Sequence, residues 1–245
     1  MKHVKCYQKG YPRPQFVRKD WEDLNGDWKF GFGEEVKEAQ ALVGGLPRTI
    51  KVPFSYETKL SGIGDQSQHC TVWYSRTIEC NTDKRTVLHI EGADYYTRVY
   101  VNGILAGSHT GAYSRISLDI TGYLRKGENM LTVRCDDDNS PAQVRGKQRW
   151  EKESFGCWYV QTTGIWKSVW LEYLDEVSLT SLKITPDITD YSVRFDFSVN
   201  KTSDDVEVRL DITFNGKKVQ SVSAIAADCE NTISVNLSSE KLTYQ

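Results

Sequence analysis

Residues 85–121 read RTVLHIEGADYYTRVYVNGILAGSHTGAYSRISLDIT, and this stretch decides the fold class. Apolar and polar side chains alternate along it, and a period of two residues is typical of half-buried β-strands. Asn102-Gly103 interrupts the second run, where a two-residue hairpin turn needs positive φ at both central positions. The strand resumes at residues 104–106, and a connection at residues 107–111 leads to a third strand. The stretch therefore predicts an antiparallel sheet without a helix.

The alternation also predicts which side chains form the core. The same pattern continues into residues 130–135, MLTVRC, after a turn at residues 127–129. Side chains that share one face of a sheet should be buried together. We therefore expect a two-sheet antiparallel sandwich over residues 16–174, with these side chains buried: Leu88, Ile90, Val99, Val101, Leu118, Ile120, Leu131 and Val133.

The composition indicates a globular protein and excludes several kinds of partner. The chain has 245 residues, 39% of them hydrophobic and 11% aromatic, with a formal net charge of −2. Charge so balanced gives no electrostatic attraction for nucleic acid or an anionic membrane. No secretory leader or membrane span is evident, which predicts a cytoplasmic protein. The six cysteines show no C-x-x-C spacing, so we expect free thiols, most of them small core residues.

Four motifs outside the central stretch carry a resemblance to a known family. They are L-N-G-x-W-x-F at residues 24–30, V-W-Y-S-R at 72–76, R-G-K-Q-x-W at 145–150, and T-T-G-I-W-x-x-V-W-L-E at 162–172. Together with V-Y-V-N-G and S-L-D-I-T they resemble the N-terminal sugar-binding domain of glycoside hydrolase family 2, which includes β-galactosidases, β-glucuronidases and β-mannosidases. The resemblance is close over residues 11–174. It implies an all-β, galactose-binding-domain-like jelly roll.

The amino-acid composition changes at residue 175, after which aromatic residues become less frequent and Ser, Thr and Asp more frequent. Alternating runs continue to residue 237 and predict about five strands, whereas an immunoglobulin-like sandwich needs about seven. We therefore expect two domains: a jelly-roll sugar-binding domain at residues 1–174, and a truncated immunoglobulin-like β-sandwich at residues 175–245.

The sequence offers no catalytic residue, and we expect no metal or cofactor. A retaining glycosidase needs two carboxyl groups about 5 Å apart, yet the 33 acidic residues fall mostly at strand exteriors, turns and loops. His89 and His109 are interpreted as packing or surface residues. The consecutive Asp136, Asp137 and Asp138 invite a metal-site interpretation, but they lack the spacing of a calcium loop, which favours a solvated loop.

Carbohydrate contacts are expected from aromatic side chains in loops, because these rings are free to stack on a sugar. Trp150, Trp158 and Tyr159 are the candidates, while Trp166 and Trp170 lie in a predicted strand and are assigned to the core. In several family members an Asp six residues before the Gly of the G-I motif binds the sugar, and the resemblance puts Trp158 at that position. His69 is the fourth candidate, because it matches a position where some members have Asn.

The resemblance implies that this chain is the non-catalytic, N-terminal sugar-binding part of a retaining enzyme that hydrolyses β-glycosides. In the family, the catalytic glutamates lie in a (β/α)₈ barrel that this sequence lacks. The expected partners are a carbohydrate and that barrel domain, and association into a homo-oligomer is left open. Two alternatives remain: a free-standing carbohydrate-binding module, and a structural sandwich that mediates oligomer contacts.

Overall fold

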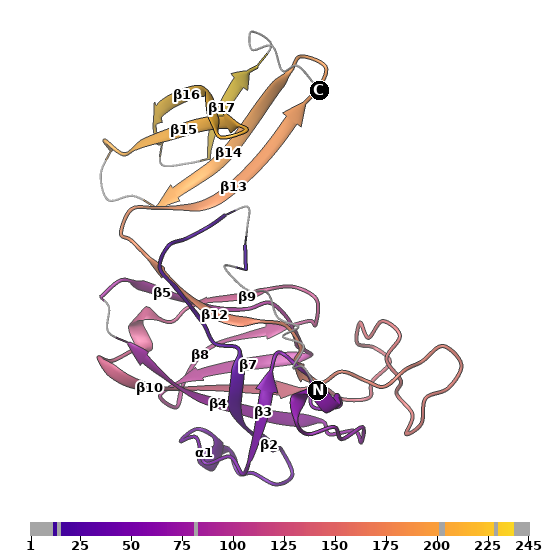
Figure 1. Ribbon diagram of the computed structural model, residues 1–245. Coiled ribbons are helices and arrows are strands. Elements are labelled where there is room, and N and C mark those ends of the chain that lie inside the picture. The colour runs from indigo at the N-terminus through magenta and orange to yellow at the C-terminus, as the bar shows by residue number, and fades with distance from the viewer. Residues whose placement is uncertain (1–11, 14–15, 81–82, 201–203, 228–229, 238–245) are drawn as a thin grey trace. The chain divides into compact units, whose positions relative to one another are not determined.

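The computed structural model describes residues 12–13, 16–80, 83–200, 204–227 and 230–237. It divides the chain into two compact units, residues 1–173 and 174–245 (Figure 1). The division lies one residue before the boundary expected from the sequence. The two units are described separately below.

The first unit is built from two main sheets. The larger has the strand order β3-β2-β4-β10-β7-β8 and the smaller β1-β12-β5-β9. The larger sheet comprises β2 (Gly26–Phe32), β3 (Arg48–Val52), β4 (Thr71–Cys80), β7 (Tyr96–Val101), β8 (Ile104–Thr110) and β10 (Gly127–Asp136). The smaller comprises β1 (Trp21–Asp23), β5 (Arg85–Ile90), β9 (Ile116–Asp119) and β12 (Val169–Leu174). All neighbours in the larger sheet pair antiparallel. The predicted all-β sandwich is confirmed.

Short elements complete the first unit. A two-stranded ladder joins β6 (Ala93–Asp94) to β11 (Gly164–Ile165). The helical pieces are one α-turn, α1 (Glu38–Ala41), and two 3₁₀ turns, η1 (Lys59–Ser61) and η2 (Thr121–Tyr123). Among the described residues, no helix has the length and apolar character needed to cross a bilayer.

One hydrophobic core holds side chains from both main sheets. Leu88 and Ile90 of β5 meet Val99, Val101, Leu131 and Val133 of the larger sheet in a single cluster, together with Ile120. These seven predicted core residues are buried. The eighth, Leu118, is only partly buried but packs against the same cluster. The period-two pattern therefore identified the inward face correctly, although its strands are divided between two sheets.

The predicted hairpin turn is confirmed, and the predicted connection after it is wrong. Asn102 and Gly103 have φ of 51° and 81° between β7 and β8, the left-handed values that such a turn requires. However, β8 continues through residues 107–110 instead of ending there. Gly107 pairs with Val99, and a Cβ at Gly107 would lie 2.7 Å from Leu118. This glycine makes room for a packed side chain rather than forming a turn.

The outward face of β5 is also buried, which strict alternation does not predict. His89 is 3% exposed and stacks on Trp170 with ring centroids 4.0 Å apart. Its Nδ1 lies 2.9 Å from Ser117 Oγ and its Nε2 lies 3.0 Å from Glu172 Oε2, and Glu172 also accepts a hydrogen bond from Arg18. His89 is therefore a packing residue, as expected. His109 is partly exposed and contacts Ser114.

Two further expectations need correction. Asp136 and Asp137 are not in a solvated loop: Asp136 ends β10, where Thr71, Arg98 and Arg134 donate to it, and Asp137 is 6% exposed. Asp138 is exposed in the loop that follows, as expected. Of the four described cysteines, only Cys80 and Cys135 are buried, whereas Cys70 and Cys157 are exposed. Cys6 and Cys229 lie outside the described residues.

The second unit contains five described strands in two small sheets. They are β13 (Ser178–Asp187), β14 (Ser192–Asn200), β15 (Glu207–Phe214), β16 (Lys217–Ile225) and β17 (Asn231–Asn236). The sheets have the orders β13-β14-β17 and β15-β16, and every pair is antiparallel. The strand count agrees with the expectation. Assignment of this unit to the immunoglobulin-like class stays a prediction.

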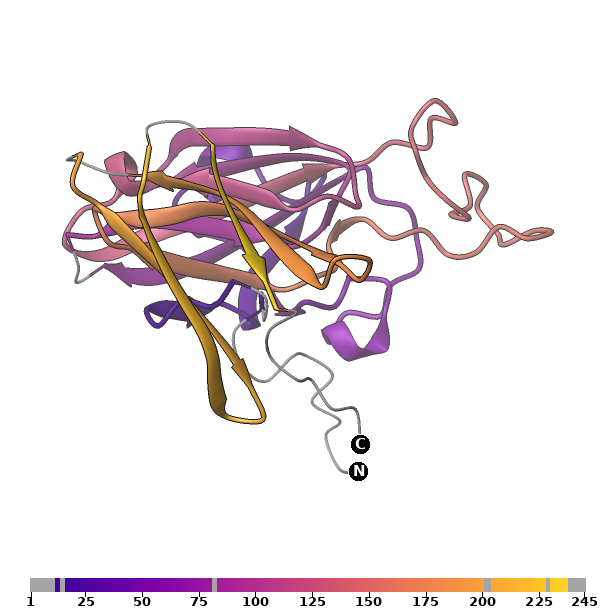
Figure 2. The same ribbon diagram turned by 90° about the horizontal axis from the view of Figure 1, so that it is seen from above.

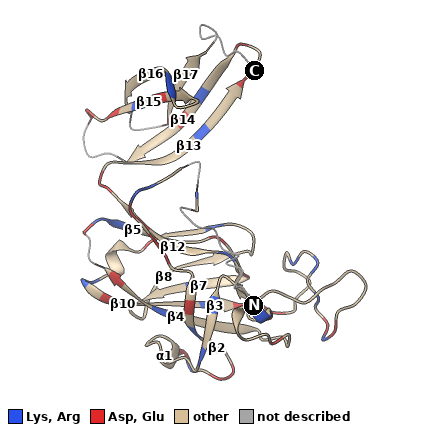
Figure 3. Cartoon of the chain, in the orientation of Figure 1, with Lys and Arg blue, Asp and Glu red and all other residues tan. Residues whose placement is uncertain are grey.

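A long loop extends from the first unit between β10 and β11, over residues 137–163. Both views show it passing beyond the ends of the sheets (Figures 1 and 2). Charged residues of both signs are interspersed along the described chain (Figure 3). The long loop, which contains no named strand or helix, is the part of the first unit that departs most from the sandwich framework.

Candidate functional site

Side chains of the R-G-K-Q-x-W motif hold together the two ends of the long loop. The Arg145 guanidinium is buried beside Asp137, with Nη1 3.4 Å from Oδ1. Asp137 also accepts a 2.7 Å hydrogen bond from the Thr163 hydroxyl. Arg149 is buried as well and donates through Nε to Gln161 Oε1 at 3.0 Å. Buried charges paired in this way hold a loop that has little regular structure of its own.

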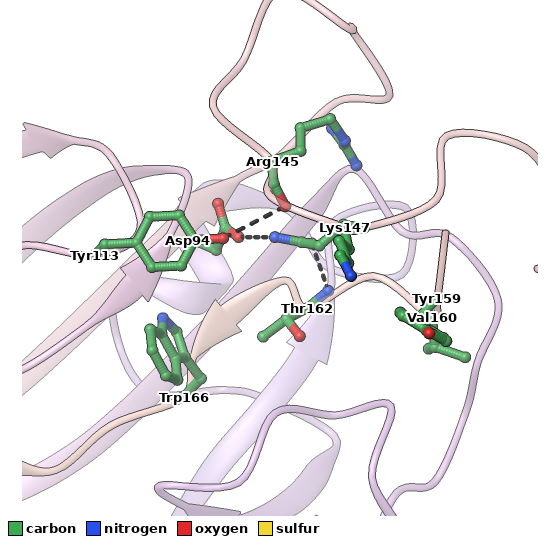
Figure 4. Close-up of a pocket in the computed structure, with 9 residues that line it drawn as sticks. Asp94, Tyr113, Arg145, Lys147, Tyr159, Val160, Thr162 and Trp166 are labelled. Carbon is green, nitrogen blue, oxygen red and sulfur yellow. Dashed lines mark hydrogen bonds between the residues drawn. The ribbon is translucent and has the colours of Figure 1, made fainter. Parts of the chain in front are cut away.

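A cavity of about 240 Å³ lies where this loop meets the β6–β11 ladder (Figure 4). We call it the Asp94 pocket; its walls carry Asp94, Tyr113, Lys147, Gln148, Tyr159 and Trp166. Asp94 and Trp166 come from the sandwich framework, whereas Lys147, Gln148 and Tyr159 come from the loop. The pocket therefore exists only because the loop folds back along the sheet edge. Such clefts, with a few placed polar groups, are the usual form of a ligand site.

Asp94 is the buried carboxyl group of this pocket, which Arg145, also buried, lines as well. Asp94 is 3% exposed, and Gln148 Nε2 donates to its Oδ2 at 2.7 Å. Burial raises the pKa of Asp94 to about 7, and the hydrogen bond from Gln148 opposes this shift only in part. Gln148 is itself oriented, because its Oε1 accepts the Thr162 N–H at 2.7 Å. A carboxyl group held in this way can accept from, or donate to, a ligand hydroxyl.

Aromatic rings supply the apolar part of the pocket. Tyr113 and Tyr159 are 55% and 60% exposed, so they keep ring surface available to a ligand. Trp166 meets Tyr113 edge to face at 6.0 Å, and its Nε1 donates to the Ala112 carbonyl at 3.0 Å. The Lys167 ammonium lies 4.6 Å from the Trp166 ring centre. A carboxyl group beside exposed rings suits a ligand that has both hydroxyls and an apolar face, as a pyranose does.

Only one of the four sugar-contact candidates lines this pocket. Tyr159 does, and it is anchored because its N–H donates to Lys147 O at 2.8 Å while its carbonyl accepts from Arg149 N–H at 2.7 Å. Trp150 and Trp158 instead pack on each other at 4.6 Å, with Phe155 against Trp150 at 5.1 Å. Both tryptophans are partly buried. They form a small aromatic cluster inside the loop.

His69 is held by neighbouring protein groups. Its ring stacks on Phe32 at 3.7 Å, Nδ1 contacts Glu34, and Nε2 lies 3.1 Å from Asp65 Oδ2. Its backbone N–H donates to the Tyr56 hydroxyl at 3.2 Å. Both ring nitrogens are occupied, so a sugar contact by His69 would require it to exchange one of these partners.

The sequence analysis missed Asp94, Tyr113 and Gln148 and assigned Trp166 to the core. Trp166 is partly exposed and lines the pocket instead. One signal was available, since Asp94 follows Gly92-Ala93 directly within the strongly patterned stretch of residues 85–121. Gln148 lies within the motif that was recognised, but its partner is 54 residues away. No local pattern indicates such a pairing.

Among the described residues, no three His, Cys, Asp or Glu side chains are grouped to hold a metal ion. Asp94 is also the single acidic residue among those lining the Asp94 pocket. Hydrolysis with retention needs two carboxyl groups across the scissile bond. The geometry of this pocket suits binding rather than bond cleavage.

Comparison with known proteins identifies the family. Residues 21–174 match the model of the sugar binding domain of glycosyl hydrolases family 2. The chain belongs to this family, and the first unit is its sugar-binding domain.

Named relatives agree with this assignment. A putative β-glucuronidase of Formosa agariphila is 28% identical over 181 residues, which are 72% of this chain and 21% of the relative. A β-galactosidase of Thermoanaerobacter pseudethanolicus is 28% identical over 82% of this chain and 24% of its own length. A solved β-glucuronidase of Bifidobacterium dentium, complexed with coumarin-3-O-glucuronide, shares the fold with a TM-score of 0.69 at 22% identity, covering 89% of this chain and 42% of that one. The chain thus spans roughly a fifth to a quarter of the two curated relatives.

Proposed function

We propose that this chain is the non-catalytic, sugar-binding part of a family 2 enzyme that hydrolyses β-glycosides, and that the Asp94 pocket contacts the sugar. The observation that carries the proposal is the position of the pocket. It lies within the region matched by the sugar-binding model, and it combines one buried carboxyl group with exposed aromatic rings. Asp94 and Gln148 would bind hydroxyls, while Tyr113 and Tyr159 would contact the apolar face of the sugar ring.

The catalytic carboxylates of the complete enzyme would lie on a barrel domain, and the bond would be cleaved with retention of configuration. Two points support a sugar-binding role for this chain and a catalytic role for a barrel domain. The curated relatives are named as β-glucuronidase and β-galactosidase, and each is several times longer than this chain. In addition, the described residues lining the Asp94 pocket include one carboxyl group where a retaining mechanism needs two. The 245-residue chain alone should therefore hydrolyse no glycoside.

The first test is an activity assay. The 245-residue chain and a form extended through a barrel domain are incubated with aryl β-galactoside, β-glucuronide and β-mannoside. Turnover is expected only for the extended form. Turnover by the 245-residue chain, abolished by Asp94→Asn or by changing another of its own carboxylates, would overturn the proposal.

The second test is calorimetric titration with galactose, glucuronic acid and mannose. Affinity no tighter than about millimolar is expected, because the barrel would complete the site. Asp94→Asn should weaken any such binding further, and Lys19→Ala, an exposed residue outside the pocket, serves as the matched control. Micromolar binding by the chain alone would instead favour a free-standing carbohydrate-binding module.

A further inference from the structure

Glu57 is a buried carboxyl group that the Asp94 pocket does not use. It follows β3 in the loop that leads to β4, and it is 4% exposed. Its Oε1 accepts the Thr163 N–H at 2.9 Å. Its Oε2 makes no well-formed hydrogen bond with a described residue, although the Ser55 hydroxyl lies close enough to the carboxyl group to lower its pKa slightly against the effect of burial. A buried carboxyl oxygen without a partner is costly, so it calls for a ligand, an ion or a water molecule.

The same side chain lines a second cavity, of about 400 Å³, which we call the Glu57 cavity. Its other polar walls include Ser55, Thr58, Lys59, Gln66 and Thr162. Lys59 forms no ion pair with another described residue, and the Gln66 side chain is exposed. The Thr58 hydroxyl donates to Ser55 O at 3.0 Å and can still accept. The cavity thus offers several donors and acceptors close to one buried carboxyl group.

The chemistry of these walls restricts the class of ligand. Val160 is the one large apolar residue among the described residues lining the cavity, so an extended apolar ligand would gain little there. A cation would face the Lys59 ammonium and lacks a grouped set of metal-ligating side chains in the described chain. An anion would find a single cationic side chain, the exposed Lys59, among the residues that the structure describes along the cavity walls. Hydroxyl groups fit, because each can both donate and accept.

We propose that the Glu57 cavity is a second binding site for a hydroxyl-rich ligand, a saccharide unit or polyol, with Glu57 as its anchor. The site is separate from the Asp94 pocket, although Val160 and Thr162 line both cavities. The proposal deepens the proposed function and rests on it for the expectation that the hydroxyl-rich ligand is a sugar. It implies that the domain contacts more than one unit of an extended saccharide.

The test is an NMR titration of the ¹⁵N-labelled chain with lactose, cellobiose, mannobiose and sorbitol. At least one probe should shift the amides of Thr163, Gly64 and Gln66, with a dissociation constant of about a millimolar. Glu57→Gln should weaken this response about tenfold, equivalent to one hydrogen bond. Lys19→Ala, at an exposed residue that lines neither cavity, should leave it unchanged. The double variant Thr58→Val/Lys59→Met changes two exposed residues at the rim of the cavity. It should also weaken the response, and it provides the test if Glu57→Gln fails to fold.

The outcomes separate the two proposals. Shifts near Asp94 with none near Glu57 would overturn this inference and leave the proposed function standing. Shifts near Glu57 that Glu57→Gln and the rim variant reduce would support the inference, even if Asp94 showed no response. Equal shifts in wild type and in both variants, or no shift with any probe, would overturn it and show that Glu57 Oε2 contacts water only.

Discussion

The two units of this protein share a sequence pattern and differ in how deeply they bury it. Among the described residues, the main core of the first unit contains 23 buried residues, whereas the core of the second contains four, supplemented by partly buried side chains. In β5 five of six residues are buried, whereas β15 alternates between partly buried and exposed. Alternation therefore identifies which residues share a face, but it does not say how completely either face is covered.

The carboxyl groups of the two units also differ in pKa, because they differ in how deeply they are buried. In the first, burial raises the pKa of Glu57 to about 8 and that of Asp94 to about 7. In the second, Asp211 is exposed to solvent on a strand, and a hydrogen bond from Arg209 lowers its pKa. Perturbed carboxyl groups in cavities are candidates for function, whereas an exposed ion pair is usually structural. Within the part of the chain that the structure describes, the carboxyl groups whose pKa is raised by burial thus lie in the first unit.

The largest expected effect compares matched core truncations. Leu131→Ala removes a fully buried side chain from the first unit and should cost about 3–4 kcal/mol of unfolding free energy. Leu210→Ala, at a partly buried position of the second unit, should cost about 1 kcal/mol. All seven tryptophans lie in the first unit, so urea unfolding followed by fluorescence reports on it, and hydrogen exchange reports on the second. Equal losses would mean that the two cores are equally well packed.

The next effect is the dependence of folding stability on pH. The pKa of Glu57 is raised in the folded state, so its neutral form contributes stability that is fully present below about pH 4.5 and lost as the pH rises through about 8. Glu57→Gln should abolish this loss, making the variant about 3 kcal/mol more stable relative to wild type at pH 9 than at pH 5. Thermal unfolding at both values measures it. Asp211→Asn is the control, and it should show no gain at high pH; a pH-independent difference for Glu57→Gln would contradict the assignment.

A smaller effect compares the two Asn-Gly turns, one in each unit. Gly103 and Gly216 have φ of 81° and 74°, and a β-branched residue resists such values. Gly103→Val should cost about 1–3 kcal/mol. Gly216 lies in the turn between β15 and β16 of the second unit, which has the smaller buried core. Gly216→Val should cost about 1 kcal/mol of local stability there. Hydrogen exchange of the flanking strands distinguishes them, and unchanged protection around Gly103→Val would count against the strained turn.

The smallest effect is expected in the long loop. Trp158→Ala removes a ring from the aromatic cluster with Trp150 and Phe155, outside the sandwich core. It should change global stability by less than about 1 kcal/mol while altering the near-ultraviolet circular dichroism of the cluster. A loss as large as that of Leu131→Ala would show that the loop is part of the cooperative core of the first unit.

Much of the framework could be predicted from the sequence, and most of the pocket could not. Val99, Val101 and the Asn102-Gly103 turn follow from local geometry, and the family motifs identified the domain. Partners of Asp94 and His69 come from segments far away in the sequence, and no local sequence pattern indicates them. Tyr159 was selected because it is an aromatic residue in a loop, and that criterion also selected Trp150 and Trp158, which pack on each other.

The sequence by itself determined the all-β class, the inward faces of the strands, the positions of the tight turns and membership of the family. These properties depend on neighbouring residues, because backbone sterics and side-chain period act over a few positions of the chain. The tertiary structure decided that His89 is buried, that Asp94 meets Gln148 across 54 residues, and that Glu57 meets Thr163 across 106. Burial and pKa depend on whatever the fold brings within a few ångströms, and only the folded chain places those groups together.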